Sequence, residues 1–390
     1  MSASDHPHRA DALRARSWLL DHAIPYWSSH GFDRAGFAYE ESDFTGAMRE
    51  TGYRRTMVQF RQAYVFAYAA LLGACDPILS RRLFARTVTA AWHPDGGWVH
   101  RLDAAGNVLD PTRDAYDQAF ALLASAWVYR LDRDPATLAS AYRTLAFMDD
   151  QLRSPFGGYE EAIPARAPRR QNPHMHLYEA LLCLYEVSQD DSFLERARGL
   201  AQLLESHFVS ESGALREYLG PALEPLAGVD GECVEPGHHA EWTWLLHEHA
   251  RLDFANGAAH TLRARALFDF VERHGFTPTG LPAERVDTHG AITHGGTKLW
   301  AMCETLKAYV VRAEAAGERS VPAISALVDA IFERFLGHQS PVWFEGVAAD
   351  GTPDTRRMPT STLYHLTLAF SELLRFSGQT PRVLRASEAP

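Results

Sequence analysis

The chain contains 390 residues, of which 46% are hydrophobic and 22% charged, and its net charge is −11. An acidic chain without a cluster of lysines and arginines excludes nucleic acid as a partner, and the lack of a long apolar run excludes membrane insertion. The four cysteines are far apart and the N-terminus has no apolar signal core, which predicts reduced thiols in a cytoplasmic protein.

Apolar periodicity and turn residues predict a mostly helical chain between loose termini at about residues 1–10 and 378–390. The predicted helices span about residues 11–29, 54–73, 78–92, 112–131, 134–152, 173–188, 190–208, 236–254, 258–274, 294–316, 319–336 and 360–377.

Short hairpin segments recur roughly every 60 residues, with two helices between each pair, which indicates a repeat architecture. They begin near Gly36, Gly96, Gly157, Gly213, Gly280 and Val342. The expected fold is an all-α (α/α)6 barrel, a closed toroid of six helical hairpins with short β-hairpins at one end. We expect a single catalytic domain over residues 1–390; an open α-solenoid is the main alternative.

Every second helix is apolar on all sides, as expected for the inner ring of such a toroid. The starts of these inner helices carry unusual polar residues, and in a toroid they would converge at one mouth. These residues are Arg61, Gln62 and Tyr64; Asp114, Tyr116 and Asp117; Asn172, His174 and His176; His238 and Glu241; His294, Lys298 and Trp300; and Tyr364 and His365. Ordinary helix caps would instead be Ser, Thr, Asp or Asn, so the pattern indicates an active site.

The stretch from Glu235 to Trp244 has the clearest local pattern. A Pro236-Gly237 turn leads into a helix, where His238 and Glu241 lie three residues apart and share a face. Such a pair is suited to acid/base chemistry, although a capped helix with a hydrogen-bonded histidine would have the same sequence.

Arg61 and His365 both lie in apolar runs. A buried arginine normally needs an anion or a ligand, whereas His365 could equally be a core histidine bonded to a carbonyl. By contrast, the charged run His247-Glu248-His249 is expected to form a solvated face.

A metal site is not expected. His174 and His176 could ligate an ion, but the H-E-x-x-H spacing is absent. Two histidines and an arginine would suffice for the chemistry of an aldose, because the C2 proton is acidic in the open-chain form. A base removes that proton to give an enediolate; reprotonation at C1 gives a ketose, and reprotonation at C2 gives the epimer.

Several segments together resemble the N-acylglucosamine 2-epimerase superfamily over about residues 50–370. They are Gln59–Tyr64, Asn172–Ala180, Pro236–Trp242, Lys298–Glu304 and Ser361–Leu366. The resemblance implies a six-hairpin α/α barrel and a metal-independent enediolate mechanism without a cofactor.

The resemblance also implies roles for individual residues. His365 would be the base at C2 and His238 the partner acid/base. Arg61 and His176 would bind substrate oxygens and Glu241 would support His238. Asn172, Trp300 and Glu304 complete the implied substrate site.

The segment Gly97–Asp103 and the compact length are most similar to bacterial mannose isomerases, so the first hypothesis is interconversion of D-mannose and D-fructose, with D-lyxose and D-xylulose as a further pair. An aldose 2-epimerase uses the same residues. A glycosidase would pair Asp117 with Glu241 or Glu304, and a helical scaffold would have no turnover. The expected partner is a monosaccharide, and the chain is expected to be a monomer or homodimer.

Overall fold

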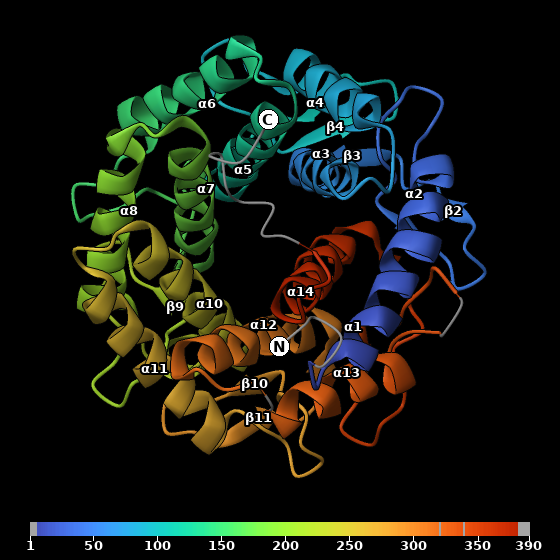
Figure 1. Ribbon diagram of the computed structural model, residues 1–390. Helices are drawn as coiled ribbons and strands as arrows, with labels where there is room; N and C mark the ends of the chain where they lie inside the picture. Colours follow the sequence, from blue (N-terminus) through green and yellow to red (C-terminus); the bar gives the residue numbers. More distant parts are fainter. Residues whose placement is uncertain (1–5, 320, 338–339, 381–390) are drawn as a thin grey trace.

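The helices form two concentric rings in the computed structural model, which describes residues 6–319, 321–337 and 340–380 (Figure 1). The inner ring consists of α3 (Thr56–Leu71), α5 (Ala115–Asp132), α7 (Asn172–Ser188), α10 (Pro236–Leu252), α12 (Leu299–Ala316) and α14 (Leu363–Phe376). The outer ring consists of α1 (Arg9–Arg16) continued by a π-helical segment (Ser17–Ala23) and α2 (Ile24–His30), then α4 (Pro77–Ala91), α6 (Pro135–Phe147), α8 (Asp191–Leu203), α11 (Gly257–His274) and α13 (Pro322–Arg334). The predicted (α/α)6 barrel is confirmed.

The two rings differ because their sequences differ. In α3 every residue from Thr56 to Ala69 is buried, whereas α4 buries one stripe and exposes the rest. A helix that is apolar on all sides is stable only where it is surrounded. The sequence of each helix therefore determines its ring.

The outer helices begin at sharp reversals with recognisable caps. Asp76 accepts a hydrogen bond from Ile78 N, and Asp134 accepts one from Ala136 N. A proline follows each aspartate at the first helical position, where a missing N–H costs nothing. These caps turn the chain back along the outside of the helix that it has just left.

A β-bridge closes a tight turn after each outer helix. The bridges are Phe32–Ala38, Trp92–Trp98, Arg153–Tyr159, Val209–Leu215, Phe276–Pro282 and Leu336–Trp343. The turns require glycine: a Cβ on Gly158, at φ +61°, would lie 2.4 Å from His174 Nε2. The six predicted hairpin segments lie at these turns.

Short strands then connect neighbouring repeats at one end of the barrel. They are β1 (Glu41–Ser42), β2 (Met48–Arg49), β3 (Tyr53–Arg55), β4 (Arg101–Asp103), β5 (Val108–Asp110), β6 (Arg113–Asp114), β7 (Ala162–Ile163), β8 (Arg169–Arg170), β9 (Tyr218–Leu219), β10 (Arg285–Val286), β11 (Ile292–His294), β12 (Thr297–Lys298), β13 (Gly346–Val347) and β14 (Met358–Pro359). The antiparallel sheets are β14-β1-β2, β3-β4-β5, β6-β7, β8-β9, β10-β11 and β12-β13. Most of these sheets pair the strand before an inner helix with the hairpin of the next repeat.

The first and last repeats meet and close the ring. Strand β1 pairs with β14, with Glu41 opposite Pro359, and Trp18 Nε1 donates to Ser340 O at 2.8 Å. His8 is buried against Ser325, so the loose tail predicted over residues 1–10 is wrong for its described part: α1 already begins at Arg9. Residues 1–5 and 381–390 lie outside the described residues.

The tenth predicted helix begins later than expected. Residues 292–294 form β11, paired with β10, and α12 begins only at Leu299. Gly295 and Gly296 lie between β11 and α12, and the helix does not extend back through them because glycine is unfavourable in a helix interior. His294 is therefore exposed on a strand and does not lie at an inner-helix start. No described helix has the length and apolar character of a membrane span.

Candidate active site

One residue per repeat occupies the same place at the rim of the barrel, two positions after the bridged residue. We call these the rim residues: Glu40, His100, Glu161, Glu217, Glu284 and Glu345. Their carbonyls accept hydrogen bonds from inner-helix starts, as Thr56 N donates to His100 O and Ala115 N to Glu161 O. The rim thus brings a ring of mostly acidic side chains to the inner-helix N-termini.

A second position also repeats, on the third or fourth residue of an inner helix. Its side chain accepts a hydrogen bond from the backbone N–H of a residue in the β-bridge and so holds the bridge to the helix. Gln59 and Gln118 accept from Ala38 N and Trp98 N, and His174 Nε2 and His239 Nε2 accept from Tyr159 N and Leu215 N. Burial lowers the pKa of both His174 and His239 to about 4, so both are neutral acceptors. These two histidines have the structural role that glutamine has in other repeats.

His238 is held by carboxylates. Its Nδ1 lies 2.9 Å from Glu217 Oε2 and 3.6 Å from Glu235 Oε2, while Nε2 lies 3.0 Å from Asn172 Nδ2. Burial opposes protonation, but the charge of Glu217 and its hydrogen bond prevail and raise the pKa of His238 to about 9. This pKa favours a charged His238 at neutral pH, for which the Asn172 amide must turn its Oδ1, which has no partner among the described residues, toward Nε2 in place of Nδ2.

The expected support of His238 by Glu241 is electrostatic only: Glu217 makes the hydrogen bond, and the charge of Glu241 also raises the pKa of His238. Burial and the neighbouring Glu304 raise the pKa of Glu241 well above its usual value. Both Glu241 carboxylate oxygens are buried and have no hydrogen-bond partner among the described residues. A buried carboxylate without a partner is costly unless a ligand supplies donors, so Glu241 is positioned to accept from a hydroxyl.

His365 has a different environment. Its Nδ1 lies 2.7 Å from Glu304 Oε1, and the other oxygen of Glu304 lies 2.6 Å from Lys307 Nζ. Burial, and then the positive charges of Arg61 and Lys307, lower the pKa of His365 well below its usual value. His365 is therefore neutral where His238 is charged.

Trp300 lies between the two histidines. Its ring centroid is 4.8 Å from that of His238 and 5.9 Å from that of His365. A partly exposed indole between an acid and a base offers an apolar surface on which the C–H face of a sugar can stack.

Arg61 lies on α3 in an aromatic setting. Its guanidinium is buried 4.1 Å from the Phe120 ring centroid and 5.0 Å from that of Tyr364, and Nη2 donates to Tyr116 Oη at 2.6 Å. Among the described residues no carboxylate pairs with Arg61, and its Nε has no acceptor. The charge is available to an oxyanion, as expected for a buried arginine that binds a ligand.

His176 completes this group from α7. Its Nδ1 is 3.2 Å from Glu179 Oε2 and 3.9 Å from Glu241 Oε1, and burial lowers its pKa to about 4. Tyr364 Oη donates to the same Glu179 oxygen at 2.5 Å. The predicted site residues therefore come together from α3, α7, α10, α12 and α14.

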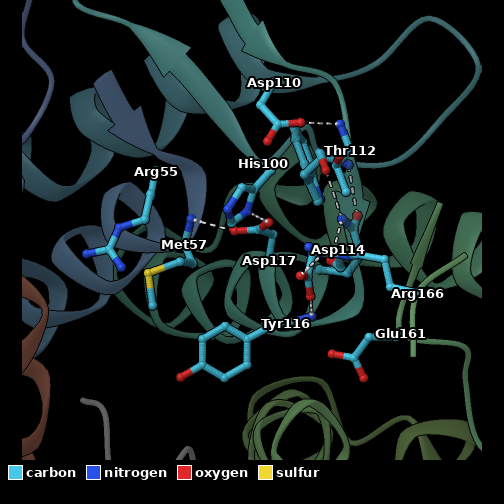
Figure 2. A network of polar contacts seen from close by, with 12 residues as sticks. Arg55, Met57, His100, Asp110, Thr112, Asp114, Tyr116, Asp117, Glu161 and Arg166 are labelled. Atoms are coloured by element: carbon cyan, nitrogen blue, oxygen red, sulfur yellow. Dashed lines mark hydrogen bonds and ion pairs between the residues drawn. The ribbon is translucent and has the colours of Figure 1, made fainter. Parts of the chain in front are cut away.

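One side of the mouth carries a separate polar network (Figure 2). Asp117 accepts from Met57 N at 3.1 Å and lies 2.8 Å from His100 Nδ1. Burial raises the pKa of Asp117 to about 6 despite His100. Asp114 caps α5 by accepting from Tyr116 N and also binds Arg166. Asp117 thus joins α3 to α5 through Met57 N and holds His100 at the rim.

Two residues of the site could not be identified from local sequence. Glu217 belongs to the rim pattern, which becomes visible only when the repeats are aligned on their bridges. Lys307 follows Glu304 by three residues, and nothing in the spacing shows that both are buried. The solvated face predicted at His247–His249 is wrong, because Glu248 and His249 are buried.

Several groups have donor atoms close enough to suit a metal: His176, Glu179 and Glu241; Glu241, Glu304 and His365; Glu217, Glu235 and His238; and, away from the mouth, His249, Asp253 and His260. In three of them a carboxylate already has a partner from outside the group: Lys307 pairs with Glu304, Arg198 pairs with Asp253, and Tyr364 donates to Glu179.

The fold is that of (α/α)6-barrel sugar enzymes. A cellobiose 2-epimerase from Bacillus thermoamylovorans B4167 superposes with a TM-score of 0.81 at 19% identity, covering 92% of this chain and 98% of that chain. A D-mannose isomerase gives the same score and identity, covering 92% and 96%.

Sequence comparison gives the family. The model of N-acylglucosamine 2-epimerase (GlcNAc 2-epimerase) matches residues 36–369. A mannose-6-phosphate isomerase from Rhizobium meliloti (strain 1021) is 33% identical over 376 residues, which cover 91% of this chain and 95% of that protein. The chain belongs to the N-acylglucosamine 2-epimerase family, and it is an enzyme of the sugar isomerase and epimerase class.

Proposed function

We propose that this protein interconverts D-mannose and D-fructose, and D-lyxose and D-xylulose as a second pair, through a metal-independent cis-enediolate. The observation that supports this is a pair of buried histidines on either side of Trp300, each with its Nδ1 on a carboxylate and with pKa values displaced in opposite directions. His238 is charged, with a pKa of about 9, and His365 is neutral. An acid and a base are thus both ready at neutral pH.

In the proposed reaction, His238 protonates the ring oxygen as the C1–O5 bond breaks and the anomeric hydroxyl loses its proton to solvent, which opens the pyranose to the aldehyde. His365 then removes the C2 proton, and negative charge develops on the enediolate oxygens. Arg61, whose guanidinium has no carboxylate partner among the described residues, would stabilise that charge. Asn172, His176 and Glu241 would hold hydroxyl groups. Transfer of the O2 hydroxyl proton to O1, with return of a proton from His365 to C1, gives the ketose.

A free sugar is proposed rather than a sugar phosphate, although the Rhizobium relative is named for a phosphate ester. Phosphate sites normally use unpaired arginines or lysines. Here Arg55 pairs with Glu40 at 2.7 Å, and Arg170 contacts both Glu161 and Asp114. These two rim arginines are thus already paired with carboxylates, which leaves Arg61 to the oxygens of the sugar itself.

A 2-epimerase is the second candidate, because the same two histidines can return the proton to C2. Its support is the fold shared with cellobiose 2-epimerase and the family description itself. The two candidates differ only in which carbon is reprotonated.

The deciding experiment is incubation with D-mannose in D₂O and EDTA, followed by chromatography and proton NMR. Fructose as the early product supports the isomerase, and glucose with deuterium at C2 supports the epimerase. The His365→Asn variant is the negative control. Conversion of mannose 6-phosphate but not mannose would contradict the free-sugar proposal, and a complete loss restored by metal would contradict the metal-independent mechanism.

A further inference from the structure

Lys307 is a buried cation that the proposed reaction does not use directly. It is one of only two lysines in the chain, with Lys298, and its side chain has 0% exposure. Its Nζ lies 4.0 Å from the centroid of the Trp244 ring. Burying an ammonium group is unfavourable unless it is paired, so its place behind the site requires a reason.

The geometry supplies one. Lys307 Nζ, Glu304 and His365 Nδ1 are in successive contact, with 2.6 Å from Nζ to Glu304 Oε2 and 2.7 Å from Glu304 Oε1 to Nδ1. One oxygen of the fully buried carboxylate is therefore in contact with the Lys307 ammonium group and the other with Nδ1 of His365. Within the described part of the chain, His365 Nε2 has no hydrogen-bond partner.

We propose that Lys307 is a positioning residue that keeps Glu304 ionised without leaving its charge unbalanced, so that the imidazole proton of His365 stays on Nδ1 and Nε2 remains a free base. The proposal rests on the role of His365 as the base. Lys307 itself contacts neither the sugar nor the reacting atoms.

Charged groups on the neighbouring helices contribute to the electrostatic potential at Lys307, Glu304 and His365. Glu304 and Lys307 belong to α12, Glu179 to α7, Glu241 and His238 to α10, and Arg61 to α3. Lys307 therefore supplies positive charge to a region that holds the three buried carboxyl groups of Glu179, Glu241 and Glu304.

Loss of Lys307 would protonate Nε2 by either of two routes. If Glu304 takes up a proton, it donates that proton to Nδ1, and the imidazole hydrogen moves to Nε2. If Glu304 stays ionised, its unbalanced charge draws a second proton onto His365. In both cases the lone pair that accepts the C2 proton is lost at neutral pH.

The other histidine of the site supports this argument. His238 also bonds a buried carboxylate, Glu217, but among the described residues no lysine or arginine pairs with Glu217. There the carboxylate raises the pKa of the histidine to about 9, after the opposing effect of burial. The cation behind the carboxylate is one difference between the two pairs; in addition, Glu235 and Glu241 add negative charge near His238, and Arg61 adds positive charge near His365.

The first test needs no substrate. Nitrogen-15 NMR of histidine-labelled protein, assigned with His365→Asn, reports the protonation of each ring nitrogen near pH 7.5. In the unmodified enzyme we expect a protonated Nδ1 and an unprotonated Nε2 for His365, and in Lys307→Gln a protonated Nε2. A protonated Nε2 in the unmodified enzyme, or an unchanged signal in the variant, would overturn the proposal.

The second test is the pH dependence of turnover with whichever aldose the enzyme converts. Lys307→Gln should lower kcat at neutral pH at least tenfold, while KM changes less. The acidic limb of the pH–rate profile should move to higher pH by more than one unit, so that activity recovers at higher pH. Lys307→Arg should restore the limb in part.

Thr305→Val on the same helix is the matched control for a buried polar-to-apolar change and should leave the profile unchanged. An equal loss at all pH values in Lys307→Gln would mean a merely structural role. Because the NMR signal does not depend on turnover, failure of the proposed sugar reaction and failure of this proposal remain distinguishable.

Discussion

At the scale of single residues, the protonation of each histidine depends on the carboxylate that contacts its Nδ1 and on the charges near that carboxylate. His238 and His365 were named from the resemblance, but their partners Glu217 and Glu304 lie 21 and 61 residues away in the chain. Local spacing points instead to Glu241, three residues from His238, which makes no such contact. Which carboxylate orients which histidine therefore depends on tertiary packing and could not be predicted from the sequence.

Arg61→Ala should reduce kcat/KM at least a hundredfold, or about 3 kcal/mol of transition-state stabilisation, because a buried unpaired guanidinium is lost from the developing oxyanion. Arg61→Lys should recover only part of this, since an ammonium cannot stack on Phe120 in the same way. Steady-state kinetics with circular dichroism measure both effects. A near-normal kcat/KM in the alanine variant would contradict the assignment.

Glu217→Gln should move the alkaline limb of the pH–rate profile to lower pH. In the proposed reaction His238 acts as an acid only while protonated, so activity should persist below its pKa of about 9 and fall as the pH rises through that value. Without the charge of Glu217, burial lowers the pKa of His238, and the alkaline limb moves to lower pH with it. Glu205→Gln, on the half-exposed partner of Arg263, is the control and should leave the limb unchanged.

At the scale of elements, the repeat explains why neighbouring histidines have different roles. His174 and His239 occupy the bridge-securing position, while His176 and His238 face the site. The sequence predicted the helices and their order well because apolar periodicity is a local property. The sequence could not show which histidines secure a bridge and which face the site, because that depends on which β-bridge lies next to each helix start.

His174→Gln should be nearly neutral, within about 1 kcal/mol in the free energy of unfolding, because glutamine can accept from Tyr159 N as Gln59 accepts from Ala38 N. His174→Ala should cost about 1–3 kcal/mol, since a buried N–H loses its acceptor. Chemical denaturation measures these values. His176→Gln is the counterpart: we expect a stable protein with much reduced activity, and equal activity in the two glutamine variants would be inconsistent with this division.

At the scale of the whole molecule, closure of the ring makes distant parts of the chain depend on one another. Trp18 of the first repeat packs against Trp343 and Phe370 of the last and hydrogen-bonds Ser340. The periodic hairpins indicated a repeat, but they could not distinguish a closed toroid from an open solenoid, because closure depends on contacts between the two ends of the chain.

Trp18→Ala should therefore destabilise the protein by about 3–5 kcal/mol, as expected for a large buried aromatic residue, and turnover and helical signal should be lost together in one thermal transition. Phe254→Ala, at a side chain that is 95% exposed, is the control and should change stability by less than about 0.5 kcal/mol. Separate transitions for the two halves of the chain would indicate an open solenoid-like unfolding.

The inner helices share a direction: the starts of α3, α5, α7, α12 and α14 all donate backbone N–H groups to rim carbonyls or to residues beside them. Each helix start contributes roughly half a positive elementary charge from its aligned peptide dipoles. The backbone alone therefore gives the mouth a positive potential, which offsets the buried rim carboxylates and favours a transient anion. Part of the stabilisation of an enediolate would then belong to the barrel as a whole, and no side-chain substitution would remove it.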